Sequence, residues 1–517
     1  MSLKNVHMHK KRGGRNMRDG TVLLKNTAVL AGGEILMRAV SLGFSSFLAR
    51  KAGAENVGIY GLIMSVYLVF ATVSLSGIRF AATRLCAQQI GFGNLYPRRL
   101  MRRAFFYALF FGALSCAAMF FSAPFAARKA IGAAEMRLPL EVLSVTLPCL
   151  PLRAAAEGYF AAKEKNVRVC AVQLLNQCVS IAVTVWLLPG NSTAEHICTC
   201  ISCGAAAGDF VSMLIVLFCY FSDVRGKKDE GIKNGGIAKT AFPLAVSSYM
   251  RIGLSSAGHI LIPFGLKKSG ASAAQSFAVY GIIHQMAFPV ITFPAAALAA
   301  LGDILIPKLT GAQVCGKKLG ISYMASRSLR LTLVFGCFIS GFMFFFADGI
   351  SMAVYKSSEA ARYIRMFAPL VTVMYLDDVT DICLKGLGQQ LHSMLFNILE
   401  AILNLVLLTQ LLPRYAIDGY IFTVYIKVAF NFALSIGRLS HITPLGISPR
   451  FAAVTFAIAA LSGAAARITG GNAAAMLLYA AYYFMAVYIA DGVSGGDVRW
   501  IISLIFKKNP EQLLTKV

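Results

Sequence analysis

The chain has 517 residues, of which 57% are apolar and only 14% are charged, and its mean hydropathy is +0.67. Soluble globular proteins carry about 25% charged and 45 to 50% apolar residues, so this composition excludes a set of soluble domains and indicates a polytopic membrane protein. The 49 Lys and Arg outnumber the 23 Asp and Glu, giving a net charge of +26. Such an excess is compatible with nucleic acid, an anionic bilayer surface or an anionic substrate until the charges are located.

Long apolar stretches recur along the whole chain. A helix needs roughly 20 residues to cross about 30 Å of hydrocarbon. Uninterrupted apolar runs are not the alternating pattern of barrel strands, and helices are the other structure that satisfies every backbone group in lipid. The sequence therefore predicts an all-α polytopic membrane protein with fourteen transmembrane helices. They are expected near residues 24–48, 57–78, 104–123, 138–160, 168–188, 197–221, 240–264, 276–301, 325–347, 363–386, 392–412, 418–437, 451–469 and 473–492.

Lys and Arg are distributed unevenly between the predicted loops. Cytoplasmic loops hold the excess of positive charge in membrane proteins. If the N-terminus is inside, most of the basic residues fall on that side, so we predict a multi-pass protein of the cell membrane with both termini cytoplasmic. The basic arm 1–22 is interpreted as a topology signal that contacts anionic headgroups. It lacks the interleaved aromatic residues typical of a nucleic-acid site.

The two halves of the chain resemble each other. Gln173–Pro189 aligns with Asn397–Pro413, and Ile59–Ile63 aligns with Val279–Ile283. Helices 1 to 6 and 7 to 12 are therefore predicted to be two copies of one six-helix unit. Because six is even, both copies enter the membrane in the same orientation, and their pseudo-twofold axis runs along the membrane normal. Two such lobes can rock against each other around a central cavity, with the last two helices as an appendage.

This repeat predicts the domain organisation. The longest predicted loop, near 222–239, is too short for a nucleotide-binding domain, and the chain has no phosphate-binding loop. ATP hydrolysis within the chain is therefore not expected to drive it. The predicted parts are a basic arm (1–22), an N-lobe (23–222), a cytoplasmic linker (223–239), a C-lobe (240–440), two further helices (450–500) and a cytoplasmic tail (501–517).

Short motifs in both halves give the chain a recognisable pattern. They are Gly158-Tyr159-Phe160, the pair Gln173 and Gln177, and Lys385–Gln390. On these motifs the chain resembles the polysaccharide-export flippases, in particular the stage V sporulation protein B type, over about residues 22–500. This group belongs to the multidrug/oligosaccharidyl-lipid/polysaccharide superfamily, which also holds the lipid II flippases. The family's usual Arg-Gly-Tyr-Phe begins here with Glu157.

The resemblance implies a flippase and not an enzyme. Such a protein moves a lipid-linked oligosaccharide, a precursor of the cell wall or of a polysaccharide, from the inner to the outer leaflet by alternating access. The expected partners are the lipid-linked glycan and membrane lipids, without nucleic acid, and a monomer is expected. No cofactor is expected beyond a coupling sodium ion or proton. The alternative is a cation-coupled multidrug or small-molecule antiporter of the same superfamily.

Basic residues near or within the predicted spans are candidates for substrate binding, because a charge in lipid is costly and normally faces a cavity or a partner. Arg38 and Arg251 occupy related positions in the two copies, where they would hold the diphosphate of a lipid-linked sugar. An ion pair with Glu34 is the alternative for Arg38. Arg153 is interpreted as structural. Arg79 is either a headgroup anchor or part of an inward-facing mouth.

Helix 363–386 carries an acidic cluster, Asp377, Asp378 and Asp381. This DDxxD spacing is one by which membrane prenyltransferases hold magnesium on a prenyl diphosphate, so an intramembrane enzyme is a remote alternative. A coupling site for sodium or a proton, or pairing of these acids with Lys385 or Lys427, is preferred, because no second acidic motif faces the first. Asp377 and Asp381 share a helix face, and Asp378 lies about 100° away. Glu400 is a weaker candidate for the same site.

His284 is flanked by Gln285, Pro289 and Pro294, and these prolines are expected to open the helix and free carbonyl groups. It is therefore a candidate substrate-binding residue, and a hydrogen-bonded packing role is the alternative. Cysteines such as those of the segment 198–203 are interpreted as small apolar residues. No catalytic residue and no metal site are predicted.

Overall fold

The computed structural model describes residues 4–91, 96–163, 165–188, 193–227, 237–446, 448–468 and 473–490. Every regular element in these ranges is a helix. Nine helices in the described part are long and apolar enough to cross a membrane, so the predicted all-α polytopic fold is confirmed. Gly32–Ile90 and Gln390–Ile442 have 59 and 53 residues, far more than one crossing requires. The predicted count of fourteen is consistent with this.

The first half of the chain contains seven helices. Their breaks differ from the prediction at several places, and the expected helix 138–160 is two helices. Pro148 has no N–H to donate to the preceding turn, and the chain bends there. The seven are α1 (Lys4–Leu75), α2 (Ile78–Gly91), α3 (Arg98–Phe125), α4 (Arg137–Thr146), α5 (Cys149–Ala162), α6 (Asn166–Leu187) and α7 (Ala194–Val224).

Two predicted helices lie in α1, which begins within the basic arm and changes direction at Gly53. Gly53 has φ 80°, a left-handed conformation that glycine adopts without the cost a side chain adds. The predicted helices 392–412 and 418–437 are likewise joined into one element, which breaks at Ala416. Predicted boundaries at these two places therefore correspond to sharp bends and not to open loops.

The second half is helical in the same way, with one irregular region. Between α9 and α11 the backbone forms a π-helical turn at Ile282–Ala287 and a 3-10 turn at Phe293–Ala295. The helices are α8 (Ile237–Lys268), α9 (Ala273–Gly281), α10 (Phe288–Thr292), α11 (Ala296–Val314), α12 (Lys318–Tyr355), α13 (Glu359–Gly386), α14 (Gln390–Ile442), α15 (Pro449–Ile468) and α16 (Ala473–Ile489).

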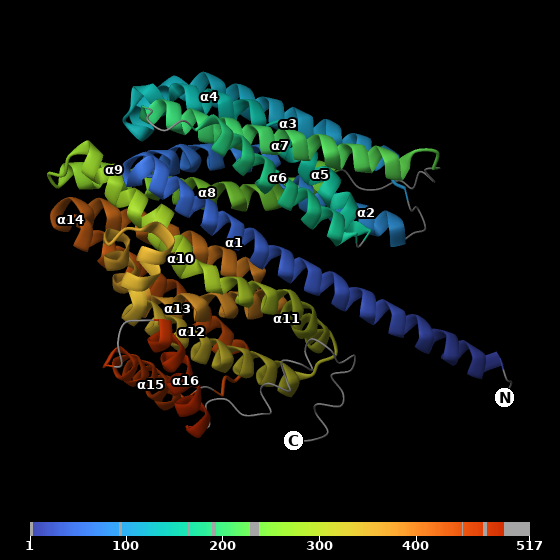
Figure 1. The fold of residues 1–517 in the computed structure, drawn as a ribbon. Coiled ribbons are helices and arrows are strands. Elements are labelled where there is room, and N and C mark those ends of the chain that lie inside the picture. Colours follow the sequence, from blue (N-terminus) through green and yellow to red (C-terminus); the bar gives the residue numbers. More distant parts are fainter. Residues whose placement is uncertain are drawn as a thin grey trace.

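The helices form two groups with α1, α8 and α9 between them (Figure 1). One group holds α2 to α7, and the other holds α10 to α14, with α15 and α16 on its outer side. α1 packs against both groups, including α3 and α6 on one side and α9 and α11 on the other. The largest apolar core runs through α1 and α9 to α14, and a second core lies within the first group. Polar side chains on α1 and on the irregular region consequently lie between the groups.

Candidate substrate cavity and coupling site

A cavity of about 400 Å³ lies between α1 and the irregular region that follows α9. Arg38, Ser41 and Ser45 line it from α1, and His284 and Gln285 line it from the opposite side. Of the four predicted substrate-binding residues, the structure thus brings Arg38 and His284 into one cavity. The apolar remainder of the wall is Leu42, Phe288, Pro289 and Phe293, with Thr292 beside them.

The irregular backbone supplies the polar groups of this cavity. A π-helical turn and prolines leave carbonyl groups without their usual helical donors. Arg38 Nη1 donates to the carbonyl oxygen of Thr292 at 3.2 Å, and Ser45 Oγ donates to that of Gln285 at 2.6 Å. The prediction that the prolines open this helix is confirmed. The alternative pairing of Arg38 with Glu34 is not found among the described side chains, and Arg38 instead joins α1 to α10.

His284 has packing partners as well as a place in the cavity wall. Its Nε2 lies 2.9 Å from the hydroxyl of Tyr420, and its ring is 4.7 Å from the rings of His259 and Tyr280. The two interpretations of His284 are therefore compatible, since Tyr420 orients the ring that faces the cavity.

The other two basic candidates lie elsewhere. Arg251 is exposed on α8 and does not line the cavity of Arg38, so the two arginines are not brought together in this conformation. Arg79 is largely exposed, and its Nε lies 3.8 Å from Oε2 of the buried Glu157. Arg79 thus has a carboxylate partner at the start of α2, on the side where α2 meets α5.

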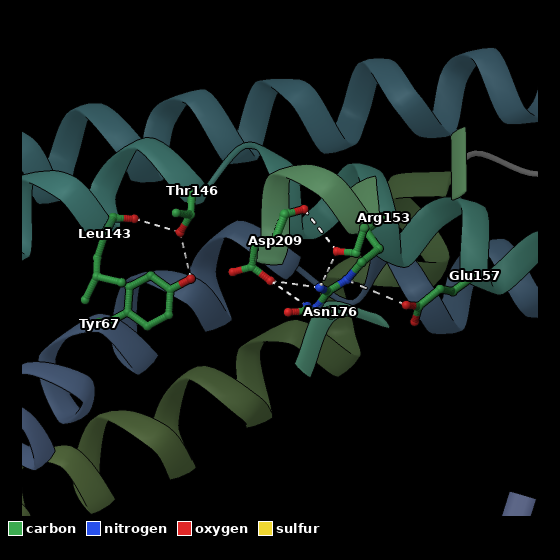
Figure 2. A network of polar contacts seen from close by, with 8 residues as sticks. Tyr67, Leu143, Thr146, Arg153, Glu157, Asn176 and Asp209 are labelled. Atoms are coloured by element: carbon green, nitrogen blue, oxygen red, sulfur yellow. Dashed lines mark hydrogen bonds and ion pairs between the residues drawn. The ribbon is translucent and has the colours of Figure 1, made fainter. Parts of the chain in front are cut away.

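Arg153 is the centre of a polar network inside the first group of helices (Figure 2). Its Nη1 donates to Asp209 Oδ1 at 2.8 Å and to Ser212 Oγ at 3.1 Å, and its Nε lies 3.6 Å from Glu157. Asn176 Nδ2 donates to the same oxygen of Asp209 at 2.9 Å. These contacts join α5, α6 and α7, which is the structural role expected of Arg153.

We expect Arg153→Ala to lower the stability of the protein without a specific effect on substrate. Removing one partner of a buried ion pair costs roughly 3 to 5 kcal/mol when burial is complete, and somewhat less where water reaches the pair. Arg137→Ala is the matched control, since Arg137 and Glu141 form an exposed pair one turn apart, and such pairs contribute about 0 to 1 kcal/mol. Thermal unfolding of the two purified variants measures the difference. Equal midpoints would contradict the assigned role.

Asp377 and Asp381 both contact α14. Asn431 Nδ2 donates to Asp377 Oδ2 at 2.7 Å, and Asn397 Nδ2 donates to Asp381 Oδ2 at 3.3 Å. Lys385 Nζ lies 3.7 Å from the same oxygen of Asp381. The remaining oxygens, Oδ1 of Asp377, Asp381 and Asn431, are buried and have no donor among the described residues. Buried polar atoms normally have a partner, so these oxygens are candidate ligands for a proton or a cation.

The other two acidic candidates are separate from these oxygens. Asp378 is exposed on α13, about 100° around the helix from Asp377, and lies within electrostatic range of Arg38. Glu400 Oε1 lies 3.5 Å from Lys427 Nζ on α14. No group of three or more His, Cys, Asp or Glu side chains in the described part of the chain has a metal-binding arrangement. The three aspartates therefore do not converge as a DDxxD magnesium site requires.

A tight backbone contact joins α1 and α9 close to the bend at Gly53. A Cβ atom at Gly58 would overlap the carbonyl oxygen of Phe277, and one at Gly281 would overlap that of Ala54. Arg50 adds polar contacts between the groups: its Nη2 donates to the carbonyl oxygen of Ala353 at 2.9 Å and its Nε to that of Val354 at 3.1 Å. We call these contacts of Gly58, Gly281 and Arg50 the seal.

The comparisons with known proteins agree with this geometry. Residues 23–257 match the model of the polysaccharide biosynthesis protein family. The chain is 22% identical to stage V sporulation protein B of Bacillus subtilis (strain 168), over 85% of this chain and 88% of that protein. The predicted resemblance to this family is confirmed. The sporulation protein YkvU of the same organism is 21% identical over 71% of this chain and 82% of its own length.

Two solved transporter structures share the fold. The lipid II flippase MurJ in an inward closed conformation gives a TM-score of 0.65 at 10% identity, covering 89% of this chain and 98% of MurJ. An inward-facing multidrug transporter of the MATE family gives a TM-score of 0.63 at 12% identity, covering 79% and 95%. The fold of this chain, with its two groups of helices, is thus similar to that of these transporters.

Sequence reasoning missed the seal. Gly281 was aligned with the first half only as part of a repeated motif, and nothing in its neighbours marks it as a contact point. The signal available was the presence of Gly58 and Gly281 in apolar helices, where glycine is otherwise unfavourable. Asn397 and Asn431 were missed as partners of the acids, because only a folded structure shows which residues of α14 face α13.

Proposed function

We propose that this chain is a flippase that moves a lipid-linked oligosaccharide, a precursor of the cell wall or of a polysaccharide, across the cell membrane. The observation that carries the proposal is the position of Arg38, a cation in a cavity between α1 and the irregular region after α9. A partly buried cation that faces a cavity attracts an anionic group such as a lipid diphosphate. The likeness to the sporulation and lipid II flippase proteins supports the same cargo class.

In this proposal the four basic candidates act in sequence along one route. Arg38 and His284 contact the headgroup within the cavity. Arg251 and Arg79 are exposed, and they attract the headgroup before it enters the cavity. An arginine can bind phosphate oxygens in a bidentate manner. In the conformation described here, which we call the sealed state because the seal is formed, Arg38 donates a hydrogen bond to the carbonyl oxygen of Thr292. The substrate must therefore compete with this carbonyl for Arg38. Both termini are placed in the cytoplasm, and the seal then faces outward.

Asp377 and Asp381 are the proposed coupling site. Their unpaired oxygens and that of Asn431 are the hard oxygen donors that sodium prefers, and a proton would satisfy the carboxylates equally well. A bound ion would supply positive charge that holds α13 and α14 together. Glu400 and Asp378 are assigned weaker roles in the same process, because Lys427 and Arg38 already offset their charges.

A cation-coupled antiporter of small molecules is the second candidate, and the likeness to the MATE transporter favours it. The basic cavity argues against cationic drugs as cargo, because like charges repel. Both candidates are transporters, and both would work by binding a substrate and changing conformation, without catalysis.

Reconstitution into liposomes with labelled lipid-linked precursors tests the proposal. The labelled headgroup is expected to become accessible on the opposite face at a rate that depends on the protein. Phosphatidylcholine with the same label is the control and should not move. Movement of a cationic dye without movement of any lipid-linked precursor would overturn the flippase in favour of the antiporter.

We expect Arg38→Ala and Arg251→Ala to reduce flipping by roughly tenfold or more, because a charged hydrogen bond contributes about 1.5 to 3 kcal/mol. Lys at either position should restore part of the activity, since it keeps the charge without the bidentate geometry. The liposome assay measures these rates at matched protein levels. Normal flipping by both Ala variants would exclude these arginines as the substrate site.

A further inference from the structure

A second pocket lies far from the cavity of Arg38, where α6 begins and α7 ends. Its volume is about 690 Å³. One side of it is basic and aromatic, with Arg168, Lys227 and Tyr96, and the other side is apolar, with Leu175, Ile215 and Phe218. The predicted repeat, the cavity and the coupling site do not account for these residues.

The basic side has more cations than one carboxylate can neutralise. Asp223 Oδ2 lies 2.8 Å from Lys163 Nζ, and Asp223 Oδ1 lies 2.6 Å from Lys165 Nζ and 3.7 Å from Arg168 Nη1. Lys227 approaches the ring of Tyr96 at 5.7 Å and forms no ion pair within the described part of the chain. Three cations thus contact one carboxylate, Lys227 lines the same pocket without a carboxylate partner among the described residues, and the pocket keeps a net positive charge.

The apolar side of the pocket continues onto the outer face of the helix pair. Phe218 is 74% exposed and Leu175 is 36% exposed, as is expected of side chains that face lipid. A soluble anion would use only the basic side. A phospholipid would use both, because its anionic phosphate and its apolar acyl chains belong to one molecule and the pocket offers basic and apolar lining next to each other.

We propose that this pocket binds an anionic phospholipid, with its headgroup phosphate on Arg168 and Lys227 and an acyl chain along Leu175 and Phe218. Basic pockets at membrane helix ends recognise anionic headgroups in this way. The lipid belongs to the leaflet on whose side α7 ends, which is the cytoplasmic leaflet in the predicted topology. It joins the ends of α5, α6 and α7 and stabilises the group of helices that carries the Arg153 network. The site does not depend on which cargo the protein moves.

Thermal unfolding of the purified full chain tests the proposal. Phosphatidylglycerol in detergent micelles should raise the unfolding midpoint by several degrees above that in phosphatidylcholine at the same mole fraction, because a ligand of the folded state stabilises it by mass action. Arg168→Gln with Lys227→Gln should abolish the difference, while Lys163 and Lys165 still neutralise Asp223. The control, Lys268→Gln with Lys318→Gln, removes two exposed cations from the second half and should respond like the wild type.

Three results would overturn the proposal: equal midpoints of the wild type in the two lipids, an undiminished response of the double variant, or equal stabilisation by glycerol 3-phosphate. The last would indicate a site for soluble anions. If the double variant does not fold, Ser222→Glu decides, because it keeps every cation and adds an acid to a residue that lines the pocket and is exposed. It should lose the phosphatidylglycerol response, and Ser222→Ala should keep it.

Discussion

Gly281→Ala is expected to open the seal and to reduce flipping to background. The added methyl group would overlap the carbonyl oxygen of Ala54 and would lie 2.8 Å from the backbone nitrogen of Gly58. Backbone atoms of a helix cannot move aside as a flexible side chain does. Overpacking of this kind costs about 1 to 3 kcal/mol, and each 1.4 kcal/mol changes a population tenfold. Because the clash exists only where α1 and α9 meet, it penalises the sealed state alone.

A cysteine at Ser41 measures this effect. Ser41 lines the cavity, so in a cysteine-free background Ser41→Cys should be protected from an impermeant thiol reagent applied on the side of Gly53. With Gly281→Ala added, the same cysteine should react at least about tenfold faster, in line with the population change. Gly253→Ala is the matched control, since a Cβ there meets nothing within 4 Å. Unchanged labelling together with normal flipping would show that the seal does not gate the cavity.

The fold was predictable from the sequence because each signal was local. Apolar runs of sufficient length predict helices wherever they occur, and Pro289 and Pro294 predicted an opened helix between α9 and α11. The bends at Gly53 and Ala416 were not predicted as bends, because a short polar connection and a sharp kink leave the same gap in an apolar pattern. Pro148 is the opposite case, where a proline inside an apolar run divides a helix that hydropathy alone reads as continuous.

The candidate site was predictable only in part, because charge and periodicity identify residue types and not partners. The sequence singled out Arg38 and the shared face of Asp377 and Asp381. Arg38 contacts the carbonyl oxygen of Thr292, which is 254 positions away in the chain. No local sequence pattern could predict this partner. The same limit applies to Arg251, whose aligned position in the repeat suggested a neighbour of Arg38, whereas in this conformation it lies on a different surface.

Asp377→Asn and Asp381→Asn are expected to abolish the dependence of transport on a sodium or proton gradient. Each change keeps the size of the side chain and its hydrogen bond to α14 but replaces a charged oxygen donor by an amide. Loss of one charged ligand should weaken ion binding by roughly tenfold or more, equivalent to about 1.4 kcal/mol or more. Flipping rates in liposomes with imposed sodium or pH gradients measure the dependence, and chelation of magnesium should leave them unchanged.

Asp378→Asn is the internal control for this prediction. It removes the same charge from the same helix, but Asp378 is exposed, about 100° around α13 from Asp377, and has no buried oxygen without a partner, unlike Asp377 and Asp381. Its gradient dependence should therefore remain. If the DDxxD motif instead served a magnesium-dependent enzyme, all three Asn variants would lose a product made from prenyl diphosphate, because a divalent ion needs every carboxylate of the motif. Magnesium-dependent turnover of a prenyl diphosphate by the purified protein would therefore overturn both the coupling site and the flippase.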